Sequence, residues 1–278
     1  MSATTWSLNG QREAATTGRG FWRFASPQAA FGLAVRLQPV AVAIAVAALV
    51  AGLYIGFFIA PTDHQQGEAY RIIFVHVPAA WLSMLLYVAM AFWAAVGWVF
   101  NTRVSSLLAR AIAPTGALFT CLALWTGALW GQPTWGTWWV WDARLTSELL
   151  LLFLYLGVIG LQSAIDDPRR GDRAGALLAI VGVVNVPIIY FSVQWWNTLH
   201  QGASISFKAA PTMAASMLAG MLLCMLGLWA WSAVVVLRRL QGLILEREQD
   251  AAWVRTEVGG GVNRTVERSV SVDEGGRA

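Results

Sequence analysis

The residues of this chain that could perform chemistry are few, and two of its three histidines stand in distinctive surroundings. His76 lies in IIFVHVPAAW and His200 in WWNTLHQGAS, whereas His64 lies in the polar stretch PTDHQQGE. Neutral imidazole is a good ligand for haem iron, zinc or copper. A polar residue that caps a helix end at a membrane boundary is the other explanation for each histidine. The pair His76 and His200 is therefore a candidate metal-binding pair if the fold brings the two together.

A tryptophan-rich segment begins at Trp130 and reads WGQPTWGTWWVWDARLT, with five tryptophans in twelve residues. An aromatic belt at a membrane boundary explains one or two tryptophans per helix end, so five indicate a further role. On a helix, Trp135, Trp138 and Trp139 share one face. Trp138 and Trp141 are also neighbours there, because they are three residues apart. We therefore expect an amphipathic helical segment that presents an apolar shelf.

Charged residues adjoin these aromatic and imidazole groups. Asp142 is predicted to be the N-cap of the following helix, a role that is compatible with a second one, and the helix dipole favours Glu148 near the same helix start. Arg144, Arg71 and Lys208 are close in sequence to the histidines or the tryptophans. Guanidinium groups bind carboxylates such as haem propionates through charge-assisted hydrogen bonds. Arginine and lysine side chains that extend from helix ends to the membrane surface are the other explanation.

The composition indicates that a membrane protein positions these residues. Of 278 residues, 57% are hydrophobic and only 12% are charged, whereas soluble domains contain about 25% charged residues. Apolar runs of about 20 residues, enough to cross a bilayer, recur six times. The predicted spans are roughly 39–60, 79–100, 108–129, 147–165, 175–196 and 211–237. The predicted fold class is therefore an all-α integral membrane protein with six transmembrane helices.

The basic residues predict the orientation of these helices. Sixteen of the nineteen lysines and arginines fall in residues 1–38, 101–110, 166–174 and 238–278. Positive charge is enriched on the cytoplasmic side of membrane proteins, so we place both termini in the cytoplasm. The outer connections are then roughly 61–78, 130–146 and 197–210, and they hold all three histidines and the tryptophan-rich segment. The basic pI of 9.5 thus reflects topology, and no aromatic-basic platform supports nucleic-acid binding.

The chain divides into three predicted parts. Residues 1–38 form a cytoplasmic N-terminal segment, residues 39–238 the six-helix domain with its outer loop at 130–146, and residues 239–278 a cytoplasmic, disordered tail. The first apolar run follows about 38 mixed residues and is too long for a cleaved signal peptide, so we expect an uncleaved anchor. Cys121 and Cys224 lie in predicted spans and are expected to be small buried residues.

The tryptophan-rich segment also carries a family resemblance. WGTWWVWDARLT at 135–146 resembles the WWD signature W-G-x-x-W-x-W-D of haem-handling proteins in cytochrome c maturation. With its length, its six spans and its two flanking histidines, the chain resembles the CcmC family over roughly residues 39–240. The larger CcmF-type and CcsA-type relatives, which have more spans or extra ligand histidines, fit less well. The residues that match those of the family are Trp135, Gly136, Trp139, Trp141 and Asp142 in the signature, and His76 and His200 as an axial pair.

This resemblance implies a haem-transfer protein without enzymatic turnover. Such proteins hold haem b at the periplasmic face of the bacterial inner membrane and deliver it to the haem chaperone CcmE. The implied partners are the ABC-transporter components CcmA and CcmB and the small protein CcmD. The tryptophan shelf, Trp138 included, would then cover the porphyrin edge and dock the chaperone. Arg144, together with Arg71 or Lys208, would hold the propionates.

Two other classes of function follow from the residues alone. A transmembrane electron-transfer protein usually needs haem ligands at both membrane depths, whereas the three histidines are all predicted on the outer side. A solute transporter would show a broken helix at mid-membrane. GVVNVPIIY in the fifth span is the one candidate, because Pro187 removes a helical hydrogen bond and Asn185 could satisfy the freed groups. A structural kink is the favoured explanation, and an absorption spectrum with a Soret band would exclude a plain transporter.

Overall fold

A computed structural model describes residues 26–196, 198–200 and 213–258, and the regular elements within them are helices. Six of these helical stretches, counting η4 with α1, η5 with α2 and α5 with α6, are long and apolar enough to cross a membrane. The six spans predicted from the apolar runs are thereby confirmed as helices. The elements are α1 (Pro27–Tyr54), the π-helical η4 (Ile55–Ile59), the 3₁₀-helical η5 (Glu68–Ile72), α2 (Ile73–Phe100), α3 (Arg103–Trp135), α4 (Ala143–Ala164), α5 (Pro168–Gly182), α6 (Asn185–Trp195) and α7 (Ala215–Arg247).

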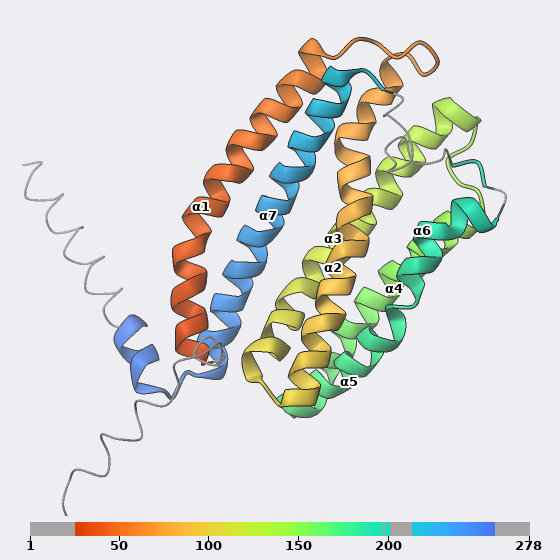
Figure 1. Cartoon of the computed structure of the whole chain (residues 1–278). Coiled ribbons are helices and arrows are strands. Elements are labelled where there is room, and N and C mark those ends of the chain that lie inside the picture. Colours follow the sequence, from red (N-terminus) through yellow and green to blue (C-terminus); the bar gives the residue numbers. More distant parts are fainter. Residues whose placement is uncertain (1–25, 197, 201–212, 259–278) are drawn as a thin grey trace, which may run out of the picture.

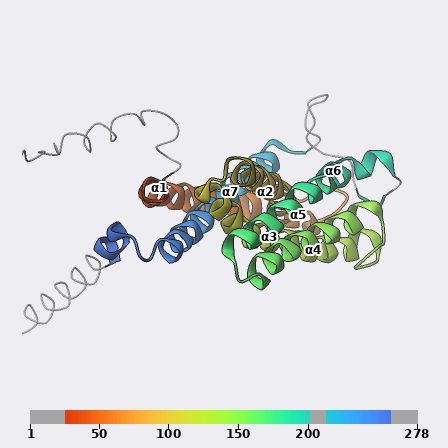
Figure 2. The same ribbon diagram turned by 90° about the horizontal axis from the view of Figure 1, so that it is seen from below.

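The six spans run alternately up and down in a bundle, and helices distant in sequence lie side by side (Figure 1). The first and last helices, α1 and α7, pack along each other, and α7 in turn contacts α2 and α3. Figure 2 shows α1 at the edge of the molecule, with α7 between it and the other helices. Small residues permit this approach: a Cβ at Gly52 would lie 2.7 Å from the backbone nitrogen of Cys224. Close backbone contact of this kind is common between membrane helices.

The core of the bundle positions α4 against α2 and α3. Tyr155 of α4 is fully buried, and its hydroxyl donates a hydrogen bond of 2.8 Å to the carbonyl oxygen of Ser83 on α2. Gly116 on α3 makes room for it, because an added Cβ there would lie 2.1 Å from the tyrosine ring. The Tyr87 ring packs on the Tyr155 ring edge-to-face with a centroid separation of 4.9 Å. The residues of α2 and α4 that lie up to three helical turns before this contact in the sequence belong to the candidate site.

Several helices extend beyond the predicted apolar runs. α1 begins at Pro27, where Ser26 accepts a hydrogen bond from the backbone of Ala29, so residues 27–38 belong to the helix. α7 continues to Arg247, and Trp253 beyond it packs on Phe31 with a ring separation of 5.8 Å. Residues 239–258 therefore pack on the bundle, where the sequence predicted a disordered tail. The remaining tail, residues 259–278, lies outside the described residues.

The predicted kink in the fifth span is observed as the break between α5 and α6. The break falls at Val183 and Val184, just before Pro187. Asn185 is buried, and its side-chain amide donates a hydrogen bond of 2.8 Å to the carbonyl oxygen of Ser147 on α4. The side-chain amide of Asn185 therefore connects the break to α4. The sequence had instead suggested that it would bond to the freed backbone groups of its own helix. This contact supports a structural role for the kink.

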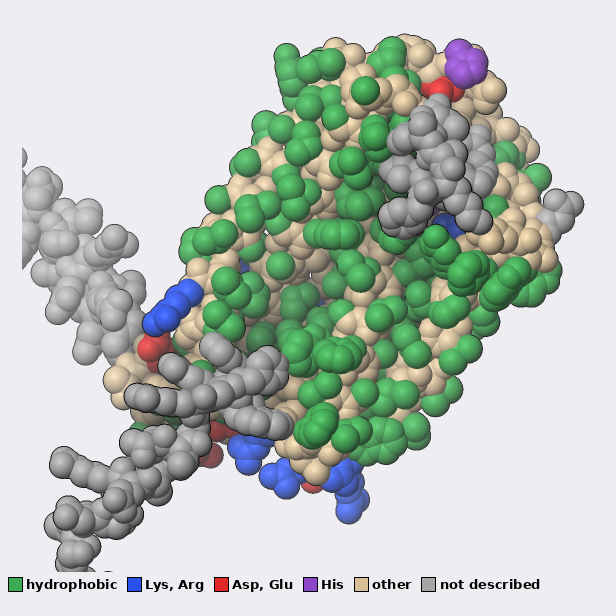
Figure 3. Space-filling model, viewed as in Figure 1, with side chains coloured by type: hydrophobic (Ala, Val, Ile, Leu, Met, Phe, Trp, Pro, Cys, Tyr) green, Lys and Arg blue, Asp and Glu red, His purple; other side chains and the backbone are tan. Residues whose placement is uncertain are grey.

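Charged side chains concentrate at one end of the bundle. Figure 3 shows hydrophobic side chains along the length of the helices and most of the visible lysines and arginines near the lower end. There Asp172 lies 3.2 Å from Arg247 and 3.9 Å from Arg110, and Arg103 lies 3.0 Å from Glu248. These ion pairs join α3 and α5 to α7 and to the segment that follows it. The opposite end contains the loops that carry the candidate site residues.

Candidate functional site

The two candidate ligand histidines line a single cavity, although 124 positions separate them in the sequence. The cavity has a volume of about 380 Å³ including its open mouth. It lies between α2, α3, α4 and the segment after α6, at the end of the bundle opposite the ion pairs. Its lining residues are His76, Ala80, Ala123, Leu124, Gly127, Arg144, Leu145, Glu148 and His200. The fold thus brings together the imidazole pair that the sequence singled out.

His76 is held in place by α3. α2 begins at Ile73, so His76 lies in its first turn, and Pro78 lies inside the helix. The ring atom Nδ1 lies 3.0 Å from the hydroxyl oxygen of Thr126. Trp130 contacts the imidazole edge-to-face at 5.5 Å between ring centroids, and its own indole N–H donates to Gln66 at 2.7 Å. His76 is therefore fixed by side chains of a neighbouring helix.

His200 is held by the loop between α3 and α4 and by the end of α3. Its ring packs edge-to-face on Trp135 with a centroid separation of 4.9 Å. Its Nδ1 faces Asp142 Oδ2 at 3.5 Å, which is longer than a good hydrogen bond. Burial and then the nearby charge of Arg144 lower the pKa of His200. The neutral ring, the form that binds metals, is therefore favoured at neutral pH.

The tryptophan-rich segment is helical only up to Trp135, and residues 136–142 form a short non-helical loop, so the prediction of an amphipathic helix through it is wrong. α3 ends at Trp135, and its C-cap Gly136 adopts a left-handed conformation with φ of 76° that glycine tolerates without strain. Within the loop, Trp138 and Trp141 are 58% and 76% exposed. Trp139 is half-buried, and its indole nitrogen is buried without a hydrogen-bond partner. The loop therefore presents two indoles outward and keeps a third half-buried.

Asp142 combines a structural and a site position. One carboxylate oxygen, Oδ1, accepts a hydrogen bond of 2.8 Å from the backbone nitrogen of Leu145. This contact confirms the predicted N-cap of α4. The other oxygen, Oδ2, is the one that faces His200, and it has no hydrogen-bond partner. The cap thus fixes the carboxylate while it leaves one oxygen directed at the imidazole.

Arg144 and Glu148 supply charge one turn apart on α4. Arg144 donates a hydrogen bond of 3.2 Å to the carbonyl oxygen of Ile189 on α6, and both charged residues line the cavity. Glu148 is only 8% exposed, and its Oε1 lacks a hydrogen-bond partner. Sequence reasoning related Glu148 to the helix dipole alone. The sequence did contain a signal for Glu148. It is a carboxylate inside an apolar run, and it lies one helical turn after Arg144, so the two side chains share a face of the helix.

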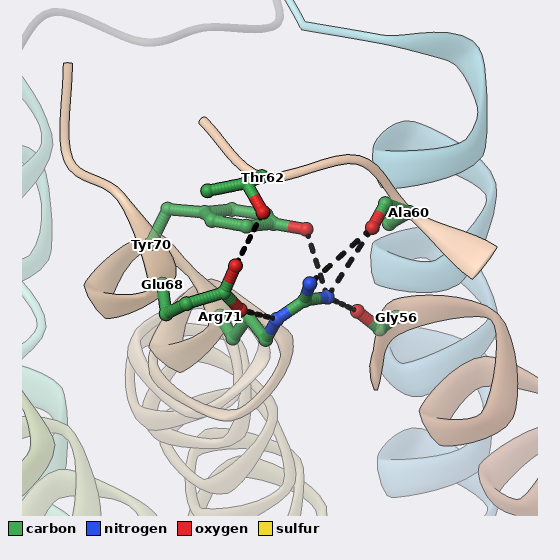
Figure 4. A network of polar contacts seen from close by, with 6 residues as sticks. All are labelled: Gly56, Ala60, Thr62, Glu68, Tyr70 and Arg71. Carbon is green, nitrogen blue, oxygen red and sulfur yellow. Dashed lines mark hydrogen bonds and ion pairs between the residues drawn. The ribbon is translucent and has the colours of Figure 1, made fainter. Parts of the chain in front are cut away.

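The structure does not bring Arg71 to the cavity. Figure 4 shows its guanidinium among Glu68, Tyr70 and the carbonyl oxygens of Gly56 and Ala60. These contacts tie η4 and the residue that follows it to η5, at the start of the second span. Arg71 therefore holds the backbone near the site, away from its lining.

The other sequence candidates are placed as follows. His64 is exposed and does not line the cavity, and Lys208 lies outside the described residues. Among the described residues no group of three histidine, cysteine or acidic side chains is close enough to hold a metal ion. Two imidazoles that line one cavity instead suit a planar ligand whose iron needs only two axial partners.

The fold and the site together define a class of protein: a six-span helical membrane protein with a histidine pair and a tryptophan-rich loop at one end. A comparison with family models narrows this class, because the model of CcmC, "Heme exporter protein C", matches residues 20–255. This chain belongs to that family, which confirms the resemblance seen in the sequence.

Individual relatives agree with this assignment. "Heme exporter protein C" of Escherichia coli strain K12 is 49% identical over 209 residues, which cover 75% of this chain and 84% of the relative. The protein of the same name from Haemophilus influenzae is 45% identical over 235 residues, 84% of this chain and 94% of the relative. A "Putative cytochrome c biosynthesis ccmC-like mitochondrial protein" from Marchantia polymorpha is 49% identical over 154 residues, 55% of this chain and 65% of the relative. The similarity therefore extends to a mitochondrial protein.

Proposed function

We propose that this protein binds haem through His76 and His200 at the periplasmic face of the inner membrane and delivers it to the haem chaperone CcmE. The observation that carries the proposal is the shared cavity: two imidazoles from distant parts of the sequence line one space. Membership of the heme exporter protein C family supports haem as the cargo. The proposed activity is binding and transfer, without a covalent change that this chain would catalyse.

The orientation in the membrane follows from charge. The ion-paired end of the bundle carries most of the basic residues, and such residues favour the cytoplasmic side. The described start of α1 and the end of α7 lie at that same end (Figure 1). We therefore infer that both termini are cytoplasmic and that the histidine cavity opens toward the periplasm.

Each described residue of the site has a proposed task. His76 and His200 would bind the iron of haem b from its two sides, and Arg144 would pair with a propionate. Trp135, which packs on His200, would form the apolar cover together with Trp139, which is also half-buried. The exposed Trp138 and Trp141 would dock the chaperone, and Gly136 and Asp142 would shape the loop between them and the cavity. We assign Arg71 to the support of the backbone, because its guanidinium is already engaged.

The partners that the family implies fit this arrangement. The ABC-transporter components CcmA and CcmB and the small protein CcmD would assemble beside the helices. α1 offers one such surface, because many large apolar side chains along it are exposed and, among the described residues, it packs mainly on α7. Lipid covers whatever such partners leave free.

A double variant tests the ligand assignment. His76→Ala combined with His200→Ala should abolish the Soret band of haem that copurifies with the full chain. His64→Ala is the matched control, since it removes the third histidine of the chain, which lies outside the cavity, and it should retain the band. A double variant that still carries haem with a bis-imidazole spectrum would overturn the assignment. A wild-type chain with no Soret band would instead favour a solute transporter.

A further inference from the structure

Thr126 is a buried polar residue near the histidine pair, and sequence reasoning gave it no role. It lies on α3, is 4% exposed, and places its hydroxyl oxygen 3.0 Å from Nδ1 of His76 on α2. The same oxygen lies 2.7 Å from the carbonyl oxygen of Leu122 and 3.3 Å from that of Ala123. Three polar atoms thus surround one hydroxyl, and each must either donate or accept a proton.

The distances in this group favour one arrangement of its protons, because the contact to Leu122 is the shortest. A hydroxyl has one proton to donate and two lone pairs with which to accept, whereas a carbonyl oxygen can only accept. The short contact to Leu122 therefore takes the proton of Thr126, in the back-bond to position i−4 that threonine makes in membrane helices. The hydroxyl oxygen of Thr126 then faces Nδ1 of His76 with a lone pair, so it can only accept a hydrogen bond there. Nδ1 of His76 must be the donor.

A proton on Nδ1 also determines the protonation of the other ring nitrogen, Nε2. A neutral imidazole carries one proton on one of its two nitrogens, and the nitrogen that lacks the proton is the one that can bind a metal. We infer that Thr126 is a positioning residue that holds the proton of His76 on Nδ1 and so keeps the lone pair of Nε2 available to the cavity. The inference rests on the proposed function only for the identity of the ligand that Nε2 would bind.

Two neighbours on α3 hold the ring in the position that this hydrogen bond requires. Gly127 lies directly beside the imidazole: an added Cβ would sit 3.1 Å from Cε1, closer than ordinary contact. Trp130, one turn after Thr126, packs on the same ring at 5.5 Å between centroids. Thr126, Gly127 and Trp130 therefore form a cradle in which rotation of the imidazole is restricted.

The cradle also argues against the alternative that His76 is only a polar cap of its helix at the membrane boundary. A histidine that only caps its own helix would bond to backbone groups of that helix, but the contact here is to a side chain of another helix, 50 residues away. Outer hydrogen-bond partners of this kind orient metal-binding histidines and raise their basicity. Loss of such a partner typically lowers metal affinity by about ten- to a hundredfold.

Nitrogen NMR of the full chain, in lipid and without haem, reads the tautomer of His76 directly. The chain has only three histidines, so isotope labelling of histidine nitrogens gives three pairs of ring signals, which His64→Ala and His200→Ala assign. His76 should show the Nδ1–H form. Thr126→Val removes the acceptor and should shift His76 toward a mixture of tautomers, whereas Thr126→Ser keeps a hydroxyl and should preserve the signal. An Nε2–H signal in the wild type, or no change in Thr126→Val, would overturn the inference.

Haem titration of the same variants separates this inference from the proposed function. Thr126→Val should bind haem about ten- to a hundredfold more weakly, with a midpoint potential shifted upward because a less basic imidazole stabilises ferric iron less. Thr126→Ser should remain close to the wild type in both readouts. If haem binds through both histidines but His76 has its proton on Nε2 in the haem-free chain, only the role of Thr126 is overturned. The expected tautomer in a chain that binds no haem would overturn the proposed function alone.

Discussion

Asp172 at the arginine-rich end of the bundle and Glu148 at the histidine end are both carboxylates in buried surroundings, with different partners. The side chain of Asp172 is 10% exposed and lies within 4 Å of two arginines, Arg247 and Arg110. Glu148 is 8% exposed as a residue, and one of its oxygens has no hydrogen-bond partner. A buried polar atom without a partner lowers stability, since it loses its contact with water and gains nothing in return.

The same contrast extends to the rest of the histidine end. Among the described residues, five buried side-chain polar atoms lack a partner, and Tyr87 supplies the one that lies outside the site. The other four are Trp139 Nε1, Asp142 Oδ2, Glu148 Oε1 and His200 Nδ1. One end of the bundle therefore pairs its polar groups for stability, while the other keeps polar groups that an incoming ligand could satisfy.

The largest predicted effect on stability is at the paired end. Asp172→Ala leaves two partly buried arginines without their carboxylate, which should lower the free energy of unfolding by about 2 kcal/mol. Haem binding at moderate temperature should be unchanged, because the site is at the far end. Denaturant unfolding in mixed micelles measures the loss. Asp250→Ala, at an exposed carboxylate of the same end, is the control, and an equal loss there would contradict the comparison.

The matching change at the histidine end should have the opposite sign. Glu148→Gln keeps the shape of the side chain and replaces a buried acid, one oxygen of which has no partner, with a neutral amide. We expect the unfolding free energy to rise by about 1 kcal/mol, since the desolvation cost of the charge disappears. The same unfolding measurement tests this expectation. A loss of stability comparable to that of Asp172→Ala would mean that the carboxylate of Glu148 is satisfied after all.

Two substitutions of Asp142 can separate its role as the N-cap of α4 from its contact with His200. Asp142→Ala removes the N-cap of α4 and should lower the unfolding free energy by about 1 kcal/mol. Asp142→Asn keeps a good cap, so its stability should match the wild type, but it removes the charge that faces His200. Haem retention should therefore fall in both variants, and unfolding should separate them. Full haem retention in Asp142→Asn would show that the amide orients His200 equally well.

Much of the fold was predictable from the sequence because apolar length is a strong physical signal. The six runs of apolar residues became six helices, and the histidines that flank the second and fifth spans meet at one end because the helices alternate in direction. The helix ends were less predictable, since hydropathy does not register polar turns that remain helical. α7 continues through a polar turn to Arg247 for this reason.

The finer features of the site depend on contacts that no local pattern encodes. Gly136 ends α3 in a left-handed turn, so a helical face through the tryptophans does not form. Arg71 contacts backbone carbonyls of a preceding segment, which only the folded chain brings near. Thr126 and Gly127 look like ordinary residues of an apolar helix, and their position beside His76 follows from the packing of α2 on α3.

The smallest effect on stability is expected at the exposed tryptophans of the loop between α3 and α4. Trp138 and Trp141 are 58% and 76% exposed, so their replacement by alanine costs little buried surface. We expect the unfolding free energy of Trp138→Ala with Trp141→Ala to stay within about 0.5 kcal/mol of the wild type. If these indoles dock the chaperone, capture of CcmE should nevertheless weaken, because aromatic side chains dominate binding at interfaces.

Trp125 on α3 provides the control that makes this last expectation decisive. It is 63% exposed and lies two to three helical turns before the loop. Trp125→Ala removes an equally exposed indole outside the loop, so it should leave both stability and chaperone capture unchanged. Haem retention by each variant is measured alongside, since a chain without haem would fail to capture the chaperone for another reason. Normal capture by a haem-loaded double variant would show that the two outward indoles belong only to the membrane boundary.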